Sequence, residues 1–160
     1  MTHANPDERG ADVRFPPPFV FLAALLLGIA LFYLAVPLHL PIGGVVAIAI
    51  GLAFVAAGLA LMIAARNHFA RTGQNPRPWT PSPELVFAGP YRFTRNPMYV
   101  GMTLIQLGLG VAFGNLWVVL LAPTALLVVH VIAVLPEERY LAAKFGEPYR
   151  EFCARVRRYI

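Results

Sequence analysis

The sequence contains little charge and almost no cysteine, and both features narrow the classes of protein it can encode. Only 13% of its 160 residues are charged and 58% are hydrophobic, whereas a soluble domain carries about 25% charged residues. The single cysteine, Cys153, allows no internal disulfide and no cysteine metal cluster, so we expect no metal site. A single membrane-embedded domain is the class that fits.

Long uncharged stretches recur along the chain. Because about 20 apolar residues span a bilayer, they predict an all-α membrane bundle of about four transmembrane helices. A secretory signal peptide would instead give one apolar run followed by a soluble sequence. In the second stretch, Gly51 and Gly58 predict close contact with another helix. The predicted helices are residues 19–36, 42–65, 98–113 and 116–135.

The remaining segments are polar or rich in proline. Residues 1–18 include three consecutive prolines and predict a mobile tail, which leaves 19–160 as the folded domain. Residues 66–97 predict a long irregular loop, a feature that is usually functional when it is ordered. Residues 138–160 place apolar side chains at helical spacing between basic ones, which predicts an amphipathic helix in the membrane interface.

The net charge of +5 comes from basic residues that lie beside the apolar stretches. Since they form no separate basic domain, we expect no nucleic-acid partner. They are concentrated in 66–97 and 138–160, and such residues favour the cytoplasmic side of a membrane. We therefore expect a multi-pass protein of the cell (inner) membrane, with both termini and the long loop in the cytoplasm. Arg155, Arg157 and Arg158 are expected to contact anionic lipid headgroups.

Two polar clusters lie at the ends of the second predicted helical hairpin. One is the segment 89–101, which contains Arg92 and Arg95, and the other is the pair Glu137-Glu138. Because a hairpin returns the chain to the side where it began, we expect the two clusters to be neighbours. Acidic groups beside a bilayer usually have a partner, and arginine binds carboxylates well. A polar site at the membrane surface is the prediction.

These clusters resemble the signature of the isoprenylcysteine carboxyl methyltransferase and phospholipid methyltransferase superfamily. The resemblance extends from about residue 69 to residue 160. Asn96 stands where many members have a histidine, and an amide does not titrate near neutral pH. The matching elements are Gly89-Pro90-Tyr91, Arg95-Asn96-Pro97-Met98-Tyr99-Val100-Gly101, Glu137-Glu138, Leu141, Phe145-Gly146 and Tyr149.

The resemblance implies an integral membrane enzyme that transfers a methyl group from S-adenosylmethionine to a lipid-like or prenylated acceptor. The acceptor would be an isoprenylcysteine carboxylate or a phospholipid amine, and the cofactor would bind at the cytoplasmic membrane face. Arg95 and Glu138 are the implied catalytic residues. The implied cofactor-binding residues are Tyr91, Arg95, Asn96, Pro97, Tyr99, Gly101, Glu137 and Glu138.

Two other interpretations remain open from the sequence. Membrane sterol and steroid reductases resemble the same C-terminal region and use NADPH, although the adjacent glutamates favour methyl transfer. A non-catalytic membrane scaffold of the same fold is the second, because Asn96 leaves no obvious base. His130 shares a helix face with Glu137, and Gln106 shares one with Tyr99. For His130 we expect an interhelical hydrogen bond. The sequence does not define the oligomeric state.

Overall fold

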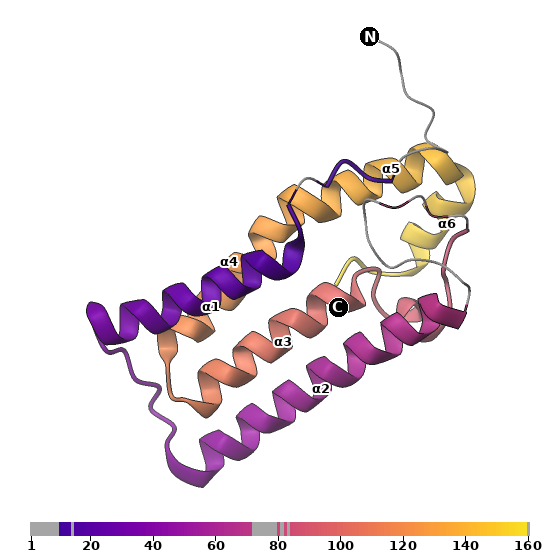
Figure 1. The fold of residues 1–160 in the computed structure, drawn as a ribbon. Coiled ribbons are helices and arrows are strands. Elements are labelled where there is room, and N and C mark those ends of the chain that lie inside the picture. Colours follow the sequence, from indigo (N-terminus) through magenta and orange to yellow (C-terminus); the bar gives the residue numbers. More distant parts are fainter. Residues whose placement is uncertain (1–9, 14, 72–79, 81, 83, 160) are drawn as a thin grey trace.

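The computed structural model describes residues 10–13, 15–71, 80, 82 and 84–159, and in these residues the fold is all-α as predicted (Figure 1). Four helices form a bundle: α1 (Pro17–Leu34), α2 (Gly44–Arg71), α3 (Pro97–Ala112) and α4 (Leu116–Val129). The other elements are a short 3-10 helix (Gly89–Arg92), a π-helical turn (His130–Val134), α5 (Leu135–Phe145) and α6 (Glu147–Arg155).

The long helices have the length and composition of membrane spans. Within the described residues, three are long and apolar enough to cross a bilayer: α1, α2 and the continuous helix Leu116–Phe145. α3 is also apolar but has 16 residues, which at 1.5 Å per residue gives about 24 Å against a hydrocarbon core of about 30 Å. Large apolar side chains such as Leu26 and Leu127 are exposed on the outer surface. The chain is therefore a multi-pass membrane protein.

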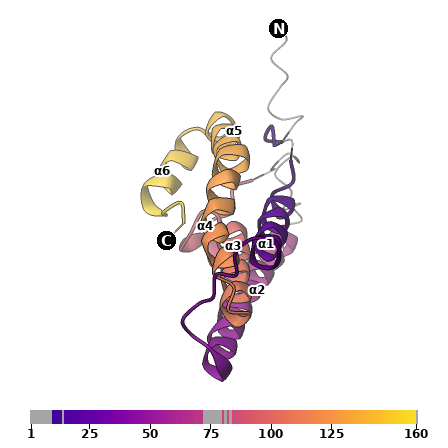
Figure 2. The ribbon, with the colours of Figure 1, turned by 90° about the vertical axis from the view of Figure 1, so that its left-hand side faces the viewer.

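The helices pack in the spatial order α2, α3, α4 and α1, and the bundle is narrow when viewed from its side (Figure 2). The backbones of α2 and α3 approach closely because small residues lie between them. A Cβ built on Gly58 would lie 2.6 Å from the carbonyl oxygen of Gly101, and one on Gly51 would lie 2.5 Å from that of Gly108. Both glycines thus make the close helix contact that the sequence predicts.

The fourth helix continues through Pro136 to Phe145, although a proline inside a helix ordinarily breaks or kinks it. Proline has no N–H group, and its ring clashes with the carbonyl group four residues earlier in a regular helix. The π-helical turn His130–Val134 widens the backbone just before this point. Pro136 then occupies the first turn of α5, where its missing N–H group is tolerated. Glu137 and Glu138 therefore lie on a continuous helix that extends from the bundle.

Both ends of the chain pack more closely than we predicted. Residues 1–9 of the predicted mobile tail lie outside the described residues, but Ala11 and Val13 are buried in a cluster with Phe21 and Val129. Because these apolar side chains face the bundle, this part of the tail is held in place.

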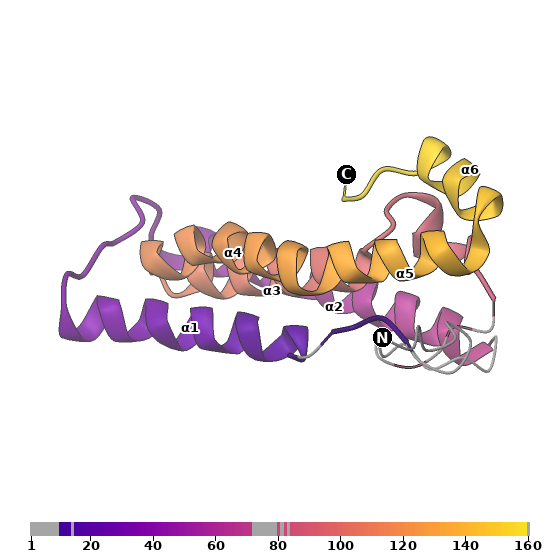
Figure 3. The same ribbon diagram turned by 90° about the horizontal axis from the view of Figure 1, so that it is seen from above.

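At the C-terminal end, the predicted single helix 138–160 forms the end of α5 and the separate helix α6, which folds back over one end of the bundle (Figure 3). The two helices meet at Gly146, whose φ of +58° is a conformation that glycine adopts readily. Tyr149 and Phe152 of α6 are buried against Ala65 and Tyr91. This apolar face therefore packs on the protein itself, where we expected the membrane interface.

The contact between α2 and α3 generates the first prediction. Gly58→Ala should destabilise the protein by about 1–3 kcal/mol, because its Cβ would press on the Gly101 carbonyl oxygen. Thermal unfolding of purified protein in detergent measures this effect. Gly43→Ala is the matched control, since a Cβ there has no neighbour within 4 Å. An unchanged unfolding temperature for Gly58→Ala would contradict the close packing.

Candidate active site

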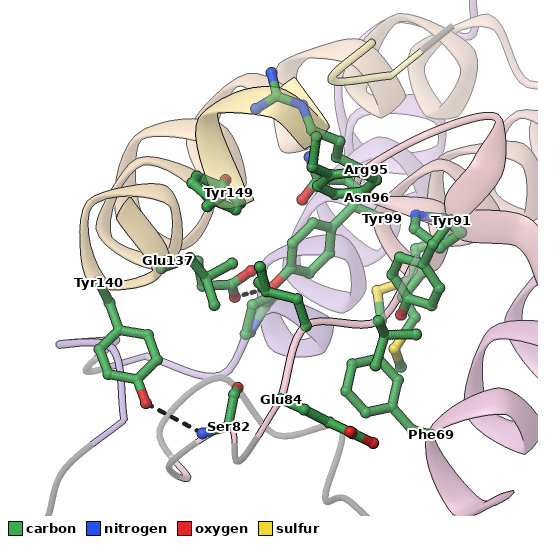
Figure 4. Close-up of a pocket in the computed structure, with 18 of the residues that line it drawn as sticks. Phe69, Ser82, Glu84, Tyr91, Arg95, Asn96, Tyr99, Glu137, Tyr140 and Tyr149 are labelled. Atoms are coloured by element: carbon green, nitrogen blue, oxygen red, sulfur yellow. Dashed lines mark hydrogen bonds between the residues drawn. The ribbon is translucent and has the colours of Figure 1, made fainter. Parts of the chain in front are cut away.

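A cavity of about 270 Å³ lies at the end of the bundle that α5 and α6 extend (Figure 4). Its wall comes from the first turn of α1, the end of α2, the 3-10 helix and the loop before it, the start of α3, α5 and α6. The two polar clusters of the sequence therefore meet, as the hairpin argument predicts. The predicted site residues on the wall are Tyr91, Arg95, Asn96, Pro97, Tyr99 and Glu137.

A hydrogen bond between Tyr99 and Glu137 joins α3 to α5 inside the cavity. The Tyr99 hydroxyl group donates to Oε1 of Glu137 over 2.5 Å (Figure 4). Pro97 begins α3 and so places Tyr99 in the first turn, while Glu137 lies in the first turn of α5. A hydroxyl bond to a carboxylate is shorter and stronger than one between neutral groups. The Glu137 carboxylate is thus fixed on the cavity wall.

Glu138 follows Glu137 in the sequence but has different partners. Arg158 donates from Nε and Nη2 to the two carboxylate oxygens of Glu138, each over 2.8 Å, and Nη1 of Arg95 lies 3.2 Å from Oε1. Glu138 is not on the cavity wall. Because successive residues on a helix point about 100° apart, one glutamate faces the cavity and the other faces arginines. A direct role of Glu138 in cofactor binding or catalysis stays a prediction.

Arg95 connects this ion pair to the cavity. Its guanidinium group contacts Glu138 and also donates from Nη1 to Sγ of Cys153 over 2.6 Å. Nε of Arg95 is buried and has no hydrogen-bond partner in the described part of the chain. A buried donor without a partner is unfavourable, and a guanidinium group binds carboxylates well. Arg95 therefore brings a positive charge to the cavity wall, and this charge is already paired with Glu138.

The C-terminal tail holds the start of α3 from outside. The Arg95 N–H group donates to the carbonyl oxygen of Arg157 over 3.0 Å. The Arg158 carbonyl oxygen accepts from Nδ2 of Asn96 over 3.0 Å and from Oγ1 of Thr94 over 3.1 Å. We expected the tail arginines to contact lipid headgroups, and no pattern in the sequence indicates these contacts with the start of α3. Asn96 thus has a structural partner in the C-terminal tail.

Gly101 and His130 contact other groups than those predicted from the sequence. Gly101 is absent from the cavity wall and faces α2, where a Cβ would lie 2.5 Å from Cγ of Met62. His130 has its Nδ1 atom 2.9 Å from the hydroxyl oxygen of Tyr159. The hydrogen bond that we expected between helices therefore reaches the C-terminal tail.

Aromatic side chains that we did not predict complete the cavity wall. They are Phe69 of α2, Tyr140 of α5, and Tyr149 and Phe152 of α6. The Ser82 N–H group donates to the Tyr140 hydroxyl oxygen over 3.1 Å, which connects the preceding loop to α5 (Figure 4). The helical spacing of the aromatic residues in 138–160 could have indicated this part of the wall. We assigned that apolar helix face to the membrane interface.

The remaining aromatic residue, Tyr91, is electrically neutral. Burial, and then the negative charge of Glu137, raise the pKa of its phenol well above the ordinary value. Its ring packs edge-to-face against Phe69, with 5.4 Å between ring centroids. The cavity thus combines one fixed carboxylate, one guanidinium group and several neutral rings, a set that suits a ligand carrying both charges.

An apolar groove of about 220 Å³ adjoins the cavity. Side chains of α1, α2 and α3 line it, and it shares Pro18 and Met102 with the cavity wall. A long apolar chain in this groove could therefore reach from the bilayer side of the bundle to the polar cavity.

Comparison with known proteins identifies a family. Residues 46–148 match the family model described as phospholipid methyltransferase, which is more than half of the chain. The match runs from the start of α2 into α6 and includes Tyr99 and Glu137. No curated protein matches the chain.

The ion pair of Glu138 generates the second prediction. Arg158→Gln should destabilise the protein by about 1–2 kcal/mol, because a largely shielded carboxylate loses its bidentate partner. Thermal unfolding in detergent measures the change. The control is Arg155→Gln, whose exposed pair with Glu151 is 4.0 Å long and should contribute less than about 0.5 kcal/mol.

A double-mutant cycle tests whether Glu138 is the partner responsible. Combining Arg158→Gln with Glu138→Gln should cost clearly less than the sum of the two single changes, since both remove the same contact. Additive effects would show that Arg158 stabilises the fold through other groups.

Proposed function

Because the chain belongs to the phospholipid methyltransferase family, whose members use S-adenosylmethionine, we propose that it methylates the amine of a phospholipid-type acceptor. The observation that carries this choice of acceptor is the Glu137 carboxylate, which Tyr99 fixes on the wall of a cavity that adjoins an apolar groove. A carboxylate would attract an ammonium headgroup and repel the carboxylate of an isoprenylcysteine. The family match also removes support from the reductase and scaffold interpretations.

The cavity residues fit the chemical groups of S-adenosylmethionine, which supplies the methyl group on its sulfonium sulfur. Arg95 lies on the cavity wall, and its positive charge would attract the carboxylate of the amino-acid part. Tyr91 and Phe69 present aromatic rings that suit the adenine base or a cation. Asn96, Pro97 and Tyr99 would complete the pocket from the start of α3.

Methyl transfer to an amine requires a free lone pair on nitrogen, so the ammonium form must first lose a proton. Glu137 would accept that proton, since it is the fixed carboxylate of the cavity and Asn96 does not titrate. The other carboxylate on the wall, Glu84, is exposed in the loop. The new carbon–nitrogen bond forms as the carbon–sulfur bond breaks, and the protein mainly aligns the reacting groups and excludes water.

The acceptor would approach from the bilayer. Its headgroup would lie beside Glu137, and its apolar chain would lie in the groove that α1, α2 and α3 form. The basic residues near this end of the bundle favour an orientation in which the cavity and both termini face the cytoplasm.

Glu137→Gln generates the third prediction. The variant should bind S-adenosylmethionine within about threefold of the wild-type affinity, but its methyl transfer should fall by about 10²–10⁴-fold because the base is lost. Calorimetry measures cofactor binding, and label transfer from S-adenosylmethionine to phosphatidylethanolamine in nanodiscs measures the reaction.

Glu84→Gln is the matched control for the loss of a cavity carboxylate, and it should keep nearly full activity because this side chain is exposed. Full activity of Glu137→Gln would exclude the base role. A folded wild-type protein that does not bind S-adenosylmethionine would refute the proposed function as a whole.

A further inference from the structure

Arg158 of the C-terminal tail joins the start of α3 to the start of α5. The tail turns back from α6 toward α3 (Figure 1), and the Arg158 carbonyl oxygen accepts from Thr94 and Asn96 directly before that helix. The guanidinium group of Arg158 binds both carboxylate oxygens of Glu138 on α5. Thr94 and Asn96 are buried, so water does not compete for these two hydrogen bonds. One residue therefore connects the two helix starts.

The relative position of α3 and α5 depends on such side-chain contacts. Within the described residues, their backbones make few close contacts with each other, whereas α3 packs closely on α2 and α4. On α3, Tyr99 lies about one turn after Asn96, and on α5, Glu137 is the neighbour of Glu138. Both members of the hydrogen-bonded pair in the cavity are therefore close to a residue that the tail holds.

Tyr159 anchors the end of the tail. Its hydroxyl oxygen lies 2.9 Å from Nδ1 of His130, in the π-helical turn that directly precedes α5. Among the residues that the structure describes on the cavity wall, neither of these two nor Arg158 is present. They therefore affect a ligand in the cavity only through the residues that they hold.

We propose that Arg158 and Tyr159 are positioning residues for methyl transfer, because they hold α5 so that the Glu137 carboxylate reaches the amine of the acceptor. This inference rests on the proposed function, and it names residues outside the cavity on which the reaction depends. A general base has to lie within hydrogen-bond distance of the proton that it accepts. A misplacement of about 1 Å can cost about 10²-fold in rate.

The test measures kcat and KM for methyl transfer from S-adenosylmethionine to phosphatidylethanolamine in nanodiscs. Arg158→Gln should lower kcat by about 10–100-fold and Tyr159→Phe by about threefold. Both variants keep the backbone carbonyl contacts with the start of α3, so KM and the calorimetric Kd of S-adenosylmethionine should stay within about threefold of the wild-type values. Arg158→Lys keeps the charge but not the bidentate geometry, and it should give an intermediate kcat.

Gly28→Ala separates positioning from a loss of stability. Its Cβ would lie 2.8 Å from Cγ2 of Val118, at the start of α4 and away from the cavity. The variant should therefore unfold at a lower temperature but keep the wild-type kcat while it is folded. Arg155→Gln, which removes a nearby arginine from an exposed pair, should also keep the wild-type kcat. A loss of kcat in Gly28→Ala as large as that in Arg158→Gln overturns the proposal.

A double-mutant cycle tests whether Arg158 acts through Glu137. In the Glu137→Gln background, Arg158→Gln should cause little further loss of rate, because the base that it positions is already absent. A further loss of the same size as in the wild-type background overturns the proposal. A wild-type kcat in the single variant Arg158→Gln does so as well.

Amide hydrogen exchange gives a readout that does not depend on the reaction. Arg158→Gln should increase exchange in residues 135–141 and leave the exchange of α2 unchanged. Unchanged exchange in 135–141 overturns the proposal, because α5 is then held without Arg158. A wild-type protein that binds S-adenosylmethionine but transfers no methyl group contradicts the proposed reaction instead, and increased exchange in the variant then still supports the hold of Arg158 on α5.

Discussion

A carboxylate beside a bilayer needs a donor or a cation close to it, and the cavity end of the bundle is organised around this constraint. Glu137 has the Tyr99 hydroxyl group, and Glu138 has Arg95 and Arg158. These contacts connect α5 to the start of α3 and to the C-terminal tail. The same interactions that stabilise the two negative charges therefore also build the cavity wall.

This arrangement requires that both glutamates lie on one helix with fixed rotation. The π-helical turn before Pro136 meets the requirement, because it lets the fourth helix continue past the proline without a break. Had the chain broken at Pro136, the direction of both carboxylates would have depended on a loop. The rigid helix directs Glu137 into the cavity and Glu138 toward the arginines.

The sequence predicts the helices and the meeting of the two polar clusters, because hydrophobic length and hairpin topology are local properties. It does not predict that Tyr149 and Phe152 form part of the cavity wall, since an apolar helix face has the same sequence pattern whether it contacts lipid or protein. The partners of Arg158 also cannot be predicted from the sequence, because tertiary contacts alone decide where a flexible charged side chain binds. Ala11 and Val13 were assigned to a mobile tail because only their tertiary contacts with the bundle show that they are buried.

The hydrogen bond of Asn96 shows that this residue has a structural role. Its amide N–H group binds the Arg158 carbonyl oxygen, so this position supports the C-terminal tail. In the proposed reaction the proton must then pass to a group that already lies in the cavity, and Glu137 meets that condition. A carboxylate suits an ammonium substrate, because the charge that attracts the headgroup also receives its proton. An amide at position 96, which cannot titrate, is therefore compatible with amine methylation.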